Sequence, residues 1–581
     1  MTAAAAGLLS QLASVQTCLS LGLVTLIYVA IRARSSSPAP SASGKLPPSL
    51  PFSWPLVGHL PEFLWDAEKL LGKATSYFGP TVPIRFRLLN RNVCMLNGPS
   101  NIAALFKSTR FISSEEWLVQ VLVKTFGVDP ADAKFYLNDN TGIGVHPQTG
   151  SNNVLPEHRI FHLVYRSVHD GLSGARLEGM QNQVIRNLSK QLSDVQADED
   201  SWTAIPDLYD SFIRKMCFTA AATSLCGSRI FQVVPTLEED FWHFDKQLPK
   251  LFKELPPWLA PTAYRARDVM KRNLAKWHAH GHSQTDLLRP QDDNAQWDEV
   301  WGSSLMRARH SFFPKMPLSA ESVAADDLGL LWAATANAIP AIGWMVLEIL
   351  QRPSLLERVR AEIAPCITGN VFDPDSFEVD VDRLCEQTLL QSIYAEVLRV
   401  HNGTVIARFP KIHDFSIGGW NLPKDEVVMI STYNTARATT VWNEGSRSDP
   451  HPLDEFWPER FVVDPKNPSS GPTKAATAAA QQSAAGQGGN GSPSAPTFSL
   501  HGTEGSWVPY GGGSRMCPGR HFAKKELLLS TSMLLTAFDF ELAPREGWIR
   551  DDTNYFMFGV MHPKGPIPAR IRRRRQASAV V

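Results

Sequence analysis

The sequence lacks an excess of charge of either sign. Lysine plus arginine and aspartate plus glutamate number 57 each in 581 residues, so no overall field attracts nucleic acid or an acidic partner. We therefore expect no nucleic-acid binding. The remaining composition, 43% hydrophobic and 20% charged, is that of a globular protein able to bury a large core and to enclose a cofactor.

Several motifs that would indicate other chemistries are also missing. The seven cysteines are scattered, with no Cys-x-x-Cys pair, which argues against a zinc site or a redox dithiol and suits a reducing compartment. The triple glycine at 511–513 is not followed by the Gly-Lys-Ser/Thr of a nucleotide-binding loop. No internal repeat of fixed period is present, which argues against a solenoid or a propeller.

Charge is absent from one long stretch, residues 8–31. A helix of about 20 apolar residues crosses a bilayer. Arg32 and Arg34 follow directly, and by the positive-inside rule they place the rest of the chain in the cytosol. A cleaved signal peptide is the competing interpretation, but no basic region precedes the apolar stretch. We expect residues 1–34 to form a single-pass membrane anchor, in the endoplasmic reticulum, followed by a Pro/Ser-rich linker at 35–55.

The remainder, residues 56–575, is expected to form one large domain, with a short tail at 576–581. Apolar residues recur at helical spacing in segments such as 355–363 and 389–400, and short β-like runs such as 81–87, 415–417 and 427–431 lie between them. This dispersal predicts a mainly helical α+β domain instead of a doubly wound sheet.

One segment of this domain has a different composition. Residues 464–505 are rich in Ala, Gln, Gly, Ser and Pro. A tract of this kind buries too little apolar surface to fold by itself. We expect it to be a disordered surface insertion.

The most informative stretch is Tyr-Gly-Gly-Gly-Ser-Arg-Met-Cys-Pro-Gly-Arg at 510–520, before an apolar helical run at 522–538. The glycines let the backbone turn tightly and approach a large planar ligand. Cys517 lies just before a predicted helix N-terminus, where unpaired N–H groups and the helix dipole stabilise a thiolate. The bland alternative is an inert, buried cysteine. An iron–sulfur cluster is disfavoured, because no further cysteine lies nearby.

These residues resemble the haem-binding signature of the cytochrome P450 superfamily, an aromatic residue followed by x-x-Gly-x-Arg-x-Cys-x-Gly. The resemblance implies the superfamily's fold, one large helical haem domain with small β-sheets, and haem b as cofactor. It assigns the axial iron ligand to the thiolate of Cys517, whose electron donation favours O–O cleavage. The other cofactor-binding residues that the motif implies are Tyr510 (where the family usually has Phe), Gly513, Arg515 and Gly519.

Two further segments stand in the superfamily's order. Glu396 and Arg399 are three residues apart, so they can pair on one helix face, and Arg460 follows in a Pro-Glu-Arg-Phe segment. By resemblance these three form a buried charge cluster that locks the loop before the cysteine. Loss of one partner would leave a buried charge unpaired, at a cost of several kcal/mol. Arg408 lies where an arginine that binds a haem propionate is common, and its fork suits a carboxylate.

The sequence departs from most of the superfamily in the central helix. The usual acid followed by Thr is missing from residues 331–340; instead Ala336-Asn337 and Pro340 resemble the branch that holds the bile-acid sterol hydroxylases and prostacyclin synthase. Pro340 predicts a bend beside Asn337, where the amide could position an ordered water. We interpret Asn337 as a catalytic residue. A bent core helix without a chemical role is the alternative.

The resemblance implies a membrane-bound monooxygenase that oxidises a hydrophobic small molecule of sterol, terpenoid or polyketide type, in specialised or lipid metabolism. Dioxygen and an NADPH-dependent reductase are the implied partners. Two alternatives stay open: a peroxide isomerase that needs no reductase, as in prostacyclin synthase, and a haem sensor or carrier without turnover.

Overall fold

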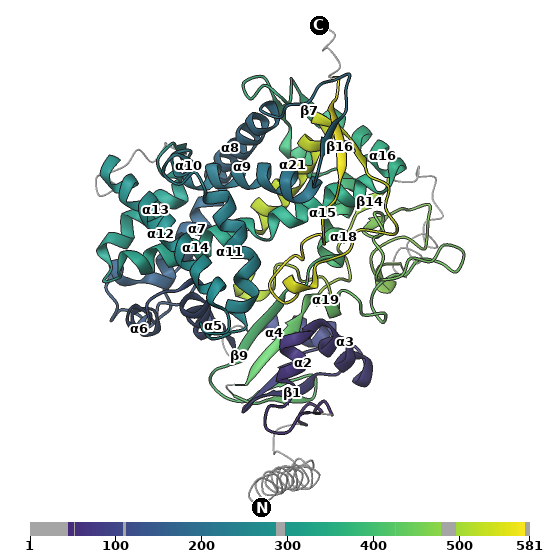
Figure 1. Ribbon diagram of the computed structural model, residues 1–581. Coiled ribbons are helices and arrows are strands. Elements are labelled where there is room, and N and C mark those ends of the chain that lie inside the picture. Colours follow the sequence, from purple (N-terminus) through teal and green to yellow (C-terminus); the bar gives the residue numbers. More distant parts are fainter. Residues whose placement is uncertain are drawn as a thin grey trace, which may run out of the picture.

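The computed structural model of the chain describes residues 45–51, 53–108, 112–285, 297–424, 426–477 and 495–575. The predicted anchor at 1–34, most of the linker and the tail at 576–581 lie outside the described residues. Helices form the bulk of the molecule and small sheets lie toward its edges (Figure 1). The mainly helical α+β domain expected from the sequence is confirmed.

The helical part is built around α15, in which every side chain from Ala338 to Ile349 is buried. Its mean hydropathy is high all round, as expected for a helix that packs on several sides, and it contacts α21, α16 and α18. The main helices are α7 (Ile160–Gly171), α8 (Gly174–Ser193), α9 (Arg214–Cys226), α11 (Leu237–Phe252), α12 (Pro261–Gln284), α13 (Ser304–Phe312), α14 (Ala320–Thr335), α15 (Ala338–Leu350), α16 (Pro353–Ile363), α18 (Thr388–Val400) and α21 (Arg520–Ala537). Shorter helices include α2 (Leu60–Trp65), α3 (Ala67–Phe78), α4 (Pro99–Lys107), α5 (Glu115–Val121), α6 (Pro130–Asn138) and α19 (Thr432–Thr435).

The largest sheet has five strands in the order β1-β2-β12-β9-β3. All neighbours pair antiparallel except β2 and β12, which are parallel. With α2 and α3 this sheet forms the lower part of the molecule in Figure 1. Its strands are β1 (Ile84–Leu88), β2 (Arg91–Met95), β12 (Val427–Ser431), β9 (Val405–Pro410) and β3 (Ile112–Ser113). A second sheet joins β15 (Phe538–Leu542), β16 (Ala569–Arg573) and β4 (Thr203–Ile205), and the hairpin of β10 (Phe415–Ile417) and β11 (Trp420–Leu422) lies apart.

The bend predicted beside Pro340 is present. Helix α14 ends at Thr335 and α15 begins at Ala338, with two turn residues between them. Pro340 lies in the first turn of α15, where a missing N–H costs no helical hydrogen bond. The sequence therefore places a helix break, with Asn337 in it, inside one long apolar segment.

Part of the predicted insertion is ordered, so the expectation of disorder over 464–505 is wrong for residues 464–477 and 495–505. Thr473 is buried and pairs with Trp442 in a β-bridge, and Asn443 donates hydrogen bonds to the carbonyls of Ser469 and Gly471. Strand β14 (Thr497–Phe498) pairs with β13 (Val462–Val463). Composition misled here because these segments also obtain partners from the rest of the domain, which composition alone does not reveal. The central part, 478–494, lies outside the described residues.

Residues 320–350 are the one segment of the described chain long and apolar enough to cross a membrane. They coincide with α14 and α15, and most of the segment is buried inside the molecule. We therefore interpret it as the core of the domain.

Candidate active site

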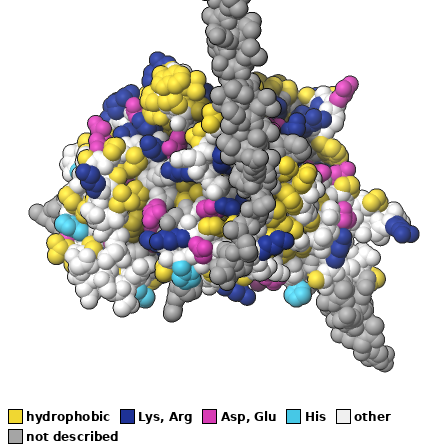
Figure 2. Space-filling view, turned by 90° about the horizontal axis from the view of Figure 1, so that it is seen from below, with side chains coloured by type: hydrophobic (Ala, Val, Ile, Leu, Met, Phe, Trp, Pro, Cys, Tyr) yellow, Lys and Arg dark blue, Asp and Glu magenta, His cyan; other side chains and the backbone are white. Residues whose placement is uncertain are grey.

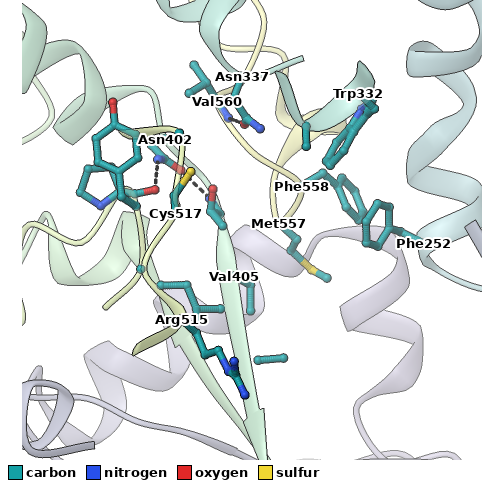
Figure 3. Close-up of a pocket in the computed structure, with 18 of the residues that line it drawn as sticks. Phe252, Trp332, Asn337, Asn402, Val405, Arg515, Cys517, Met557, Phe558 and Val560 are labelled. Atoms are coloured by element: carbon teal, nitrogen blue, oxygen red, sulfur yellow. Dashed lines mark hydrogen bonds between the residues drawn. The ribbon is translucent and has the colours of Figure 1, made fainter. Parts of the chain in front are cut away.

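A cavity of about 760 Å³ lies between α14, β9 and the loop that precedes α21. Its wall is mostly apolar, as is usual for sites that bind small molecules. In Figure 3 the sulfur of Cys517 lies on one side and an aromatic group on the other, with Asn337 between them at the helix break. The side chains that line the cavity include Phe252, Trp332, Ala338, Val405, Met557 and Phe558.

The sulfur of Cys517 is accessible from this cavity, three residues before α21 begins at Arg520. Burial by the surrounding protein raises the pKa of the thiol, and the backbone N–H groups of Gly519 and Arg520 oppose that rise. The N–H groups that the sequence places at the sulfur thus act in the expected direction, but burial has the larger effect on the pKa of the thiol. A cation bound at the sulfur would favour the thiolate further.

The glycine loop, residues 510–516, holds Cys517 in position through backbone and ring contacts. Gly513 has a φ of +70°, a conformation that favours glycine. A Cβ on Gly512 would lie 2.3 Å from the ring of Phe106. The carbonyl of Tyr510 accepts a hydrogen bond from the N–H of Cys517 at 3.0 Å, and the hydroxyl groups of Tyr510 and Tyr394 are 2.8 Å apart. Tyr510, which lines the cavity, thus fixes the loop to α18.

Two arginines line the same cavity near the glycine loop. Burial, and next to it the positive charge of Arg515, lowers the pKa of Arg408 to about 10. Arg515 has a carboxylate partner in Glu115 at 2.6 Å and also donates to the carbonyl of Ile143. Arg408 donates to the carbonyl of Ala407 at 2.8 Å, and no carboxylate partner for it is found among the described residues. The two arginines thus have one carboxylate partner, Glu115, which also pairs with Lys411 at 3.8 Å, so positive charge is in excess at this wall.

The predicted charge cluster is confirmed, and all three members are fully buried. Glu396 accepts two hydrogen bonds from Arg399, at 2.7 and 2.9 Å, and one from Arg460 at 2.9 Å. Burial raises the pKa of Glu396, but the two guanidinium groups outweigh burial and lower it to about 2. The arginines also donate to backbone carbonyls of the segment that leads toward the cysteine loop: Asn443, Pro452, Leu453 and Glu455.

Helix α18 joins this cluster to the cysteine loop. On the same helix the carbonyl of Ala395 accepts a hydrogen bond from the indole of Trp507 at 3.0 Å. Tyr394 contacts Tyr510, as described above. The geometry therefore supports the expectation that the cluster positions the loop.

Asn337 lies in the break between α14 and α15 and lines the cavity. Its side-chain oxygen accepts a hydrogen bond from the backbone N–H of Val560 at 3.0 Å (Figure 3). A Cβ on Gly559 would lie 2.0 Å from this oxygen, so the close approach of the two segments requires glycine there.

The comparisons agree with this geometry. The sequence model of the family described as cytochrome P450 matches residues 47–568. The chain belongs to the cytochrome P450 family. Two fungal relatives, the cytochrome P450 monooxygenases efuG of Hormonema carpetanum and fsoE of Humicola fuscoatra, are each 34% identical to it; the alignments cover 91% and 92% of this chain and 90% and 89% of theirs.

A more distant relative of this cytochrome P450 is the 25-hydroxycholesterol 7-alpha-hydroxylase of the rat, 25% identical over 70% of this chain and 89% of that protein. Among solved structures, the retinoic-acid-bound cyanobacterial CYP120A1 superposes with a TM-score of 0.59 at 20% identity, covering 91% of this chain and all of that one. The chain is a cytochrome P450 monooxygenase with the P450 fold, and such enzymes use haem b with an axial cysteine thiolate.

The residues present fit haem b. Cys517 would hold the iron, the glycine loop leaves room for a flat ring, and the cavity wall around it is apolar. The net positive charge of the arginine pair suits the two propionates of haem, and Arg408, which has no protein carboxylate, is better placed for them than Arg515. When bound, the haem iron supplies the chemistry of dioxygen activation. The protein holds it in place, excludes water and orients the substrate.

Sequence reasoning missed three residues of the site. Phe252 packs against both Phe558 and Trp332 on one wall of the cavity, with ring centroids 5.2 Å apart for the two phenylalanines and 5.9 Å for Phe252 and Trp332. The indole of Trp332 donates a hydrogen bond to buried Asp245 at 2.9 Å. Trp332 could have been suspected, since it lies five residues before Asn337 on α14, the helix that ends at the break. Phe252 ends a different helix, and no motif marks it.

Proposed function

We propose that this cytochrome P450 monooxygenase hydroxylates a rigid, largely apolar small molecule of terpenoid or sterol type. The observation that carries the proposal is the cavity wall opposite Cys517, formed by the rings of Phe252, Trp332 and Phe558. Flat aromatic walls bury a fused-ring skeleton over a large area without requiring polar partners. The relative that acts on 25-hydroxycholesterol supports a substrate of this size and polarity.

The wall is also held rigidly, which favours a rigid ligand. Asp245 fixes the indole plane of Trp332 from behind the cavity, and Asp245 itself is buried near His562, 3.4 Å away. A preformed wall binds a preformed skeleton with little loss of conformational entropy. A long flexible chain would lose more.

The test is a panel of tetracyclic and pentacyclic terpenoids, sterols, linear fatty acids and aromatic polyketides added to the purified haem protein. We expect a substrate-type shift of the Soret band with the fused-ring compounds and not with the fatty acids. Product analysis with a reductase and NADPH should show one added oxygen atom. A shift with fatty acids only would contradict the substrate class. Conversion of a peroxide at full rate without reductant, and no oxygen uptake, would contradict the monooxygenase reaction and favour the isomerase.

We further propose that Asn337 acts as the positioning residue for protons in the distal pocket. An amide cannot titrate as an acid. Its oxygen is committed to Val560, which leaves its NH2 group as a donor on the cavity wall. That donor can hold an ordered water beside the bend, in place of the acid and alcohol that most of the superfamily carries there.

Membrane attachment through residues 1–34 is part of the proposal. Large apolar side chains are exposed on the described chain near the N-terminal sheet: Trp65 is 93% exposed and Trp258 80%. The two lie on neighbouring segments, because Lys253, after α11, donates a hydrogen bond to the carbonyl of Leu64. The view from below shows apolar side chains gathered among Lys and Arg on this face (Figure 2). Such a mixture suits the boundary of a bilayer.

Truncation to residue 35 tests the anchor. We expect a haem-binding protein that partitions less into membranes than the full chain, with some association left through the exposed tryptophans. Replacement of Trp65 and Trp258 by serine in the truncated protein should remove that remainder. Undiminished sedimentation of the truncated protein with membranes would show that residues 1–34 are not the anchor.

A further inference from the structure

Three buried side chains of metal-binding type converge outside the cavity. They are His278 of α12, His310 of α13 and Asp327 of α14, and one ligand atom of each lies within 4.8 Å of the other two. The Nε2 atoms of His278 and His310 are 3.1 and 2.9 Å from the same oxygen, Oδ2 of Asp327. The three helices lie side by side on the left of Figure 1.

The hydrogen bonds of this cluster leave it incomplete. The other carboxylate oxygen of Asp327, Oδ1, accepts from Nε of Arg309 at 2.7 Å, so Oδ2 faces the two imidazoles alone. Nε2 of His278 is close to Oδ2 but makes no hydrogen bond, although it is buried. A buried polar atom without a partner is rare in folded proteins and is usually matched by a water or an ion.

We propose that His278, His310 and Asp327 bind a zinc-like divalent cation, with water as the fourth ligand. Bonds of about 2.0–2.1 Å in a tetrahedron separate the ligand atoms by about 3.3 Å. The two observed separations from Oδ2, 3.1 and 2.9 Å, need to widen by a few tenths of an ångström to accept the ion, and all three ligand atoms already lie within 4.8 Å of one another. Two imidazoles and a carboxylate are a usual zinc ligand set.

The surroundings are those of a ligand set held in place. Nδ1 of His310 lies 3.3 Å from Nε2 of His282; with Nε2 on the metal, Nδ1 would donate to His282, as metal-bound histidines usually do to a neighbour. The ring of His310 stacks on Trp301 at 4.1 Å, which fixes its orientation. His282 is exposed and so gives the cluster a path to solvent.

The charges also favour a cation. Asp326 and Asp327 share one guanidinium, that of Arg309, at 2.5 and 2.7 Å. Two carboxylates and one arginine leave one net negative charge in a buried place, which a divalent ion would compensate.

The site is structural, because it is remote from the reacting atoms. Asp327 precedes Asn337 by ten residues, about 15 Å along a helix, and none of the three ligands lines the cavity. The ion would clamp α12 and α13 onto α14, the helix that carries Trp332 over the cavity. Binding to the folded state alone would raise thermal stability.

The experiment uses the purified haem-loaded protein, treated with a chelator, dialysed against ZnCl2 and passed through gel filtration. We expect one zinc per haem iron by elemental analysis, two imidazoles in the X-ray absorption spectrum at the zinc edge, and a higher Tm with zinc than without. His278→Gln and His310→Gln should each weaken zinc binding at least tenfold. The matched control is His243→Gln, at an exposed histidine of α11, which should retain one zinc.

A wild-type protein that retains no zinc, or whose bound zinc shows no imidazole ligands, would overturn the proposal. So would zinc binding of wild-type strength in both histidine variants. If those variants fail to fold, as judged by haem content, the proposal is tested by the wild-type protein alone, through its ratio of zinc to haem iron and its X-ray absorption spectrum at the zinc edge.

Discussion

The side-chain oxygen of Asn337 and the backbone N–H of Val560 form a hydrogen bond of 3.0 Å that joins the break in the central helix to the segment after β15. The two residues are 223 positions apart in the chain. Because Gly559 has no side chain, the segment comes close enough to make this bond. The amide is thereby oriented with its NH2 group toward the cavity wall.

Asn337→Ala should lower product formed per NADPH consumed, by about tenfold, and raise hydrogen peroxide release by a matching amount. The reason is the loss of the donor that positions water near the haem. The ferrous carbon-monoxide spectrum should stay intact.

Gly559→Ala should produce the same uncoupling, since its methyl group displaces the amide oxygen. The control is Thr335→Val: the Thr335 hydroxyl already donates to the carbonyl of Leu331, so coupling should change little. Unaltered coupling in both Asn337→Ala and Gly559→Ala would reduce the residue to a structural role.

Cys517→Ala should abolish the red-shifted Soret band of the reduced, carbon-monoxide-bound protein. The band reports a thiolate on the iron, and Cys517 is the described cysteine that faces the cavity. Cys385→Ala, at the other described cysteine that is not fully buried, is the control and should keep the band. A normal band in the Cys517 variant would mean that another residue binds the iron.

Sequence reasoning located the parts of the site that lie in contiguous motifs. The cysteine loop, the pair of Glu396 and Arg399, and the bend at Pro340 depend on neighbours a few residues away, so a short pattern is enough to predict them. Arg460 was assigned correctly because its segment keeps a recognisable order.

The remaining parts depend on contacts between distant segments, which one sequence does not reveal. The aromatic wall brings together Phe252, Trp332 and Phe558 from three places in the chain. The ion pair between Arg515 and Glu115 also joins segments that are far apart in the chain, so the sequence did not predict it. Low complexity was read as disorder over 464–505, although the flanks of that tract pack against Trp442 and Asn443.

Glu396→Gln should destabilise the protein by about 3–5 kcal/mol, because it leaves two buried arginines without a counter-charge. We expect the variant to lose haem during purification or to unfold at a much lower Tm. The direction in which this stabilisation changes with pH follows from the lowered pKa of Glu396. Its contribution is fully present above the pKa of the unfolded chain, about 4.3, and is lost as the pH falls toward 2. The Tm difference between variant and wild type should therefore be constant from pH 6 to 8 and shrink below pH 4. A difference that is already absent at pH 7 would contradict the role of the cluster.

The two parts of the insertion, residues 478–494 and 466–477, should differ in how well they tolerate replacement. Replacing residues 478–494 by a short Gly/Ser linker should leave haem content and activity nearly unchanged, since doubling a loop's length costs only about 0.6 kcal/mol. Replacing 466–477 in the same way should lower the Tm, because Thr473 and Ala476 are buried there. Haem content and Tm of the two variants are the measurements. Equal tolerance of both replacements would show that the packed flank adds no stability.

Asp245 gives the last prediction, a dependence of stability on pH in the neutral range. Burial raises the pKa of this carboxyl to about 7, against the opposing hydrogen bond from Trp332 and the charge of Arg214. In the unfolded chain the pKa is about 3.9. Between these values the folded protein keeps a proton that the unfolded chain has lost, so stability falls as the pH rises from 4 to 7 and is level above that.

Asp245→Asn removes this titration and keeps an oxygen that can accept from Trp332. The Tm of the variant relative to wild type should therefore increase from pH 5 to pH 8, by an amount equivalent to about 2.7 kcal/mol, because only the two pH units between 5 and 7 contribute. Glu239→Gln, at an exposed carboxylate of the same helix, serves as the control for the loss of an acidic group. The substrate-induced Soret shift should be preserved in the Asp245 variant, because the indole keeps its acceptor. A Tm difference that is the same at pH 5 and pH 8 would show that Asp245 does not change protonation over this range, and that Trp332 is held by a carboxylate already ionised at pH 5.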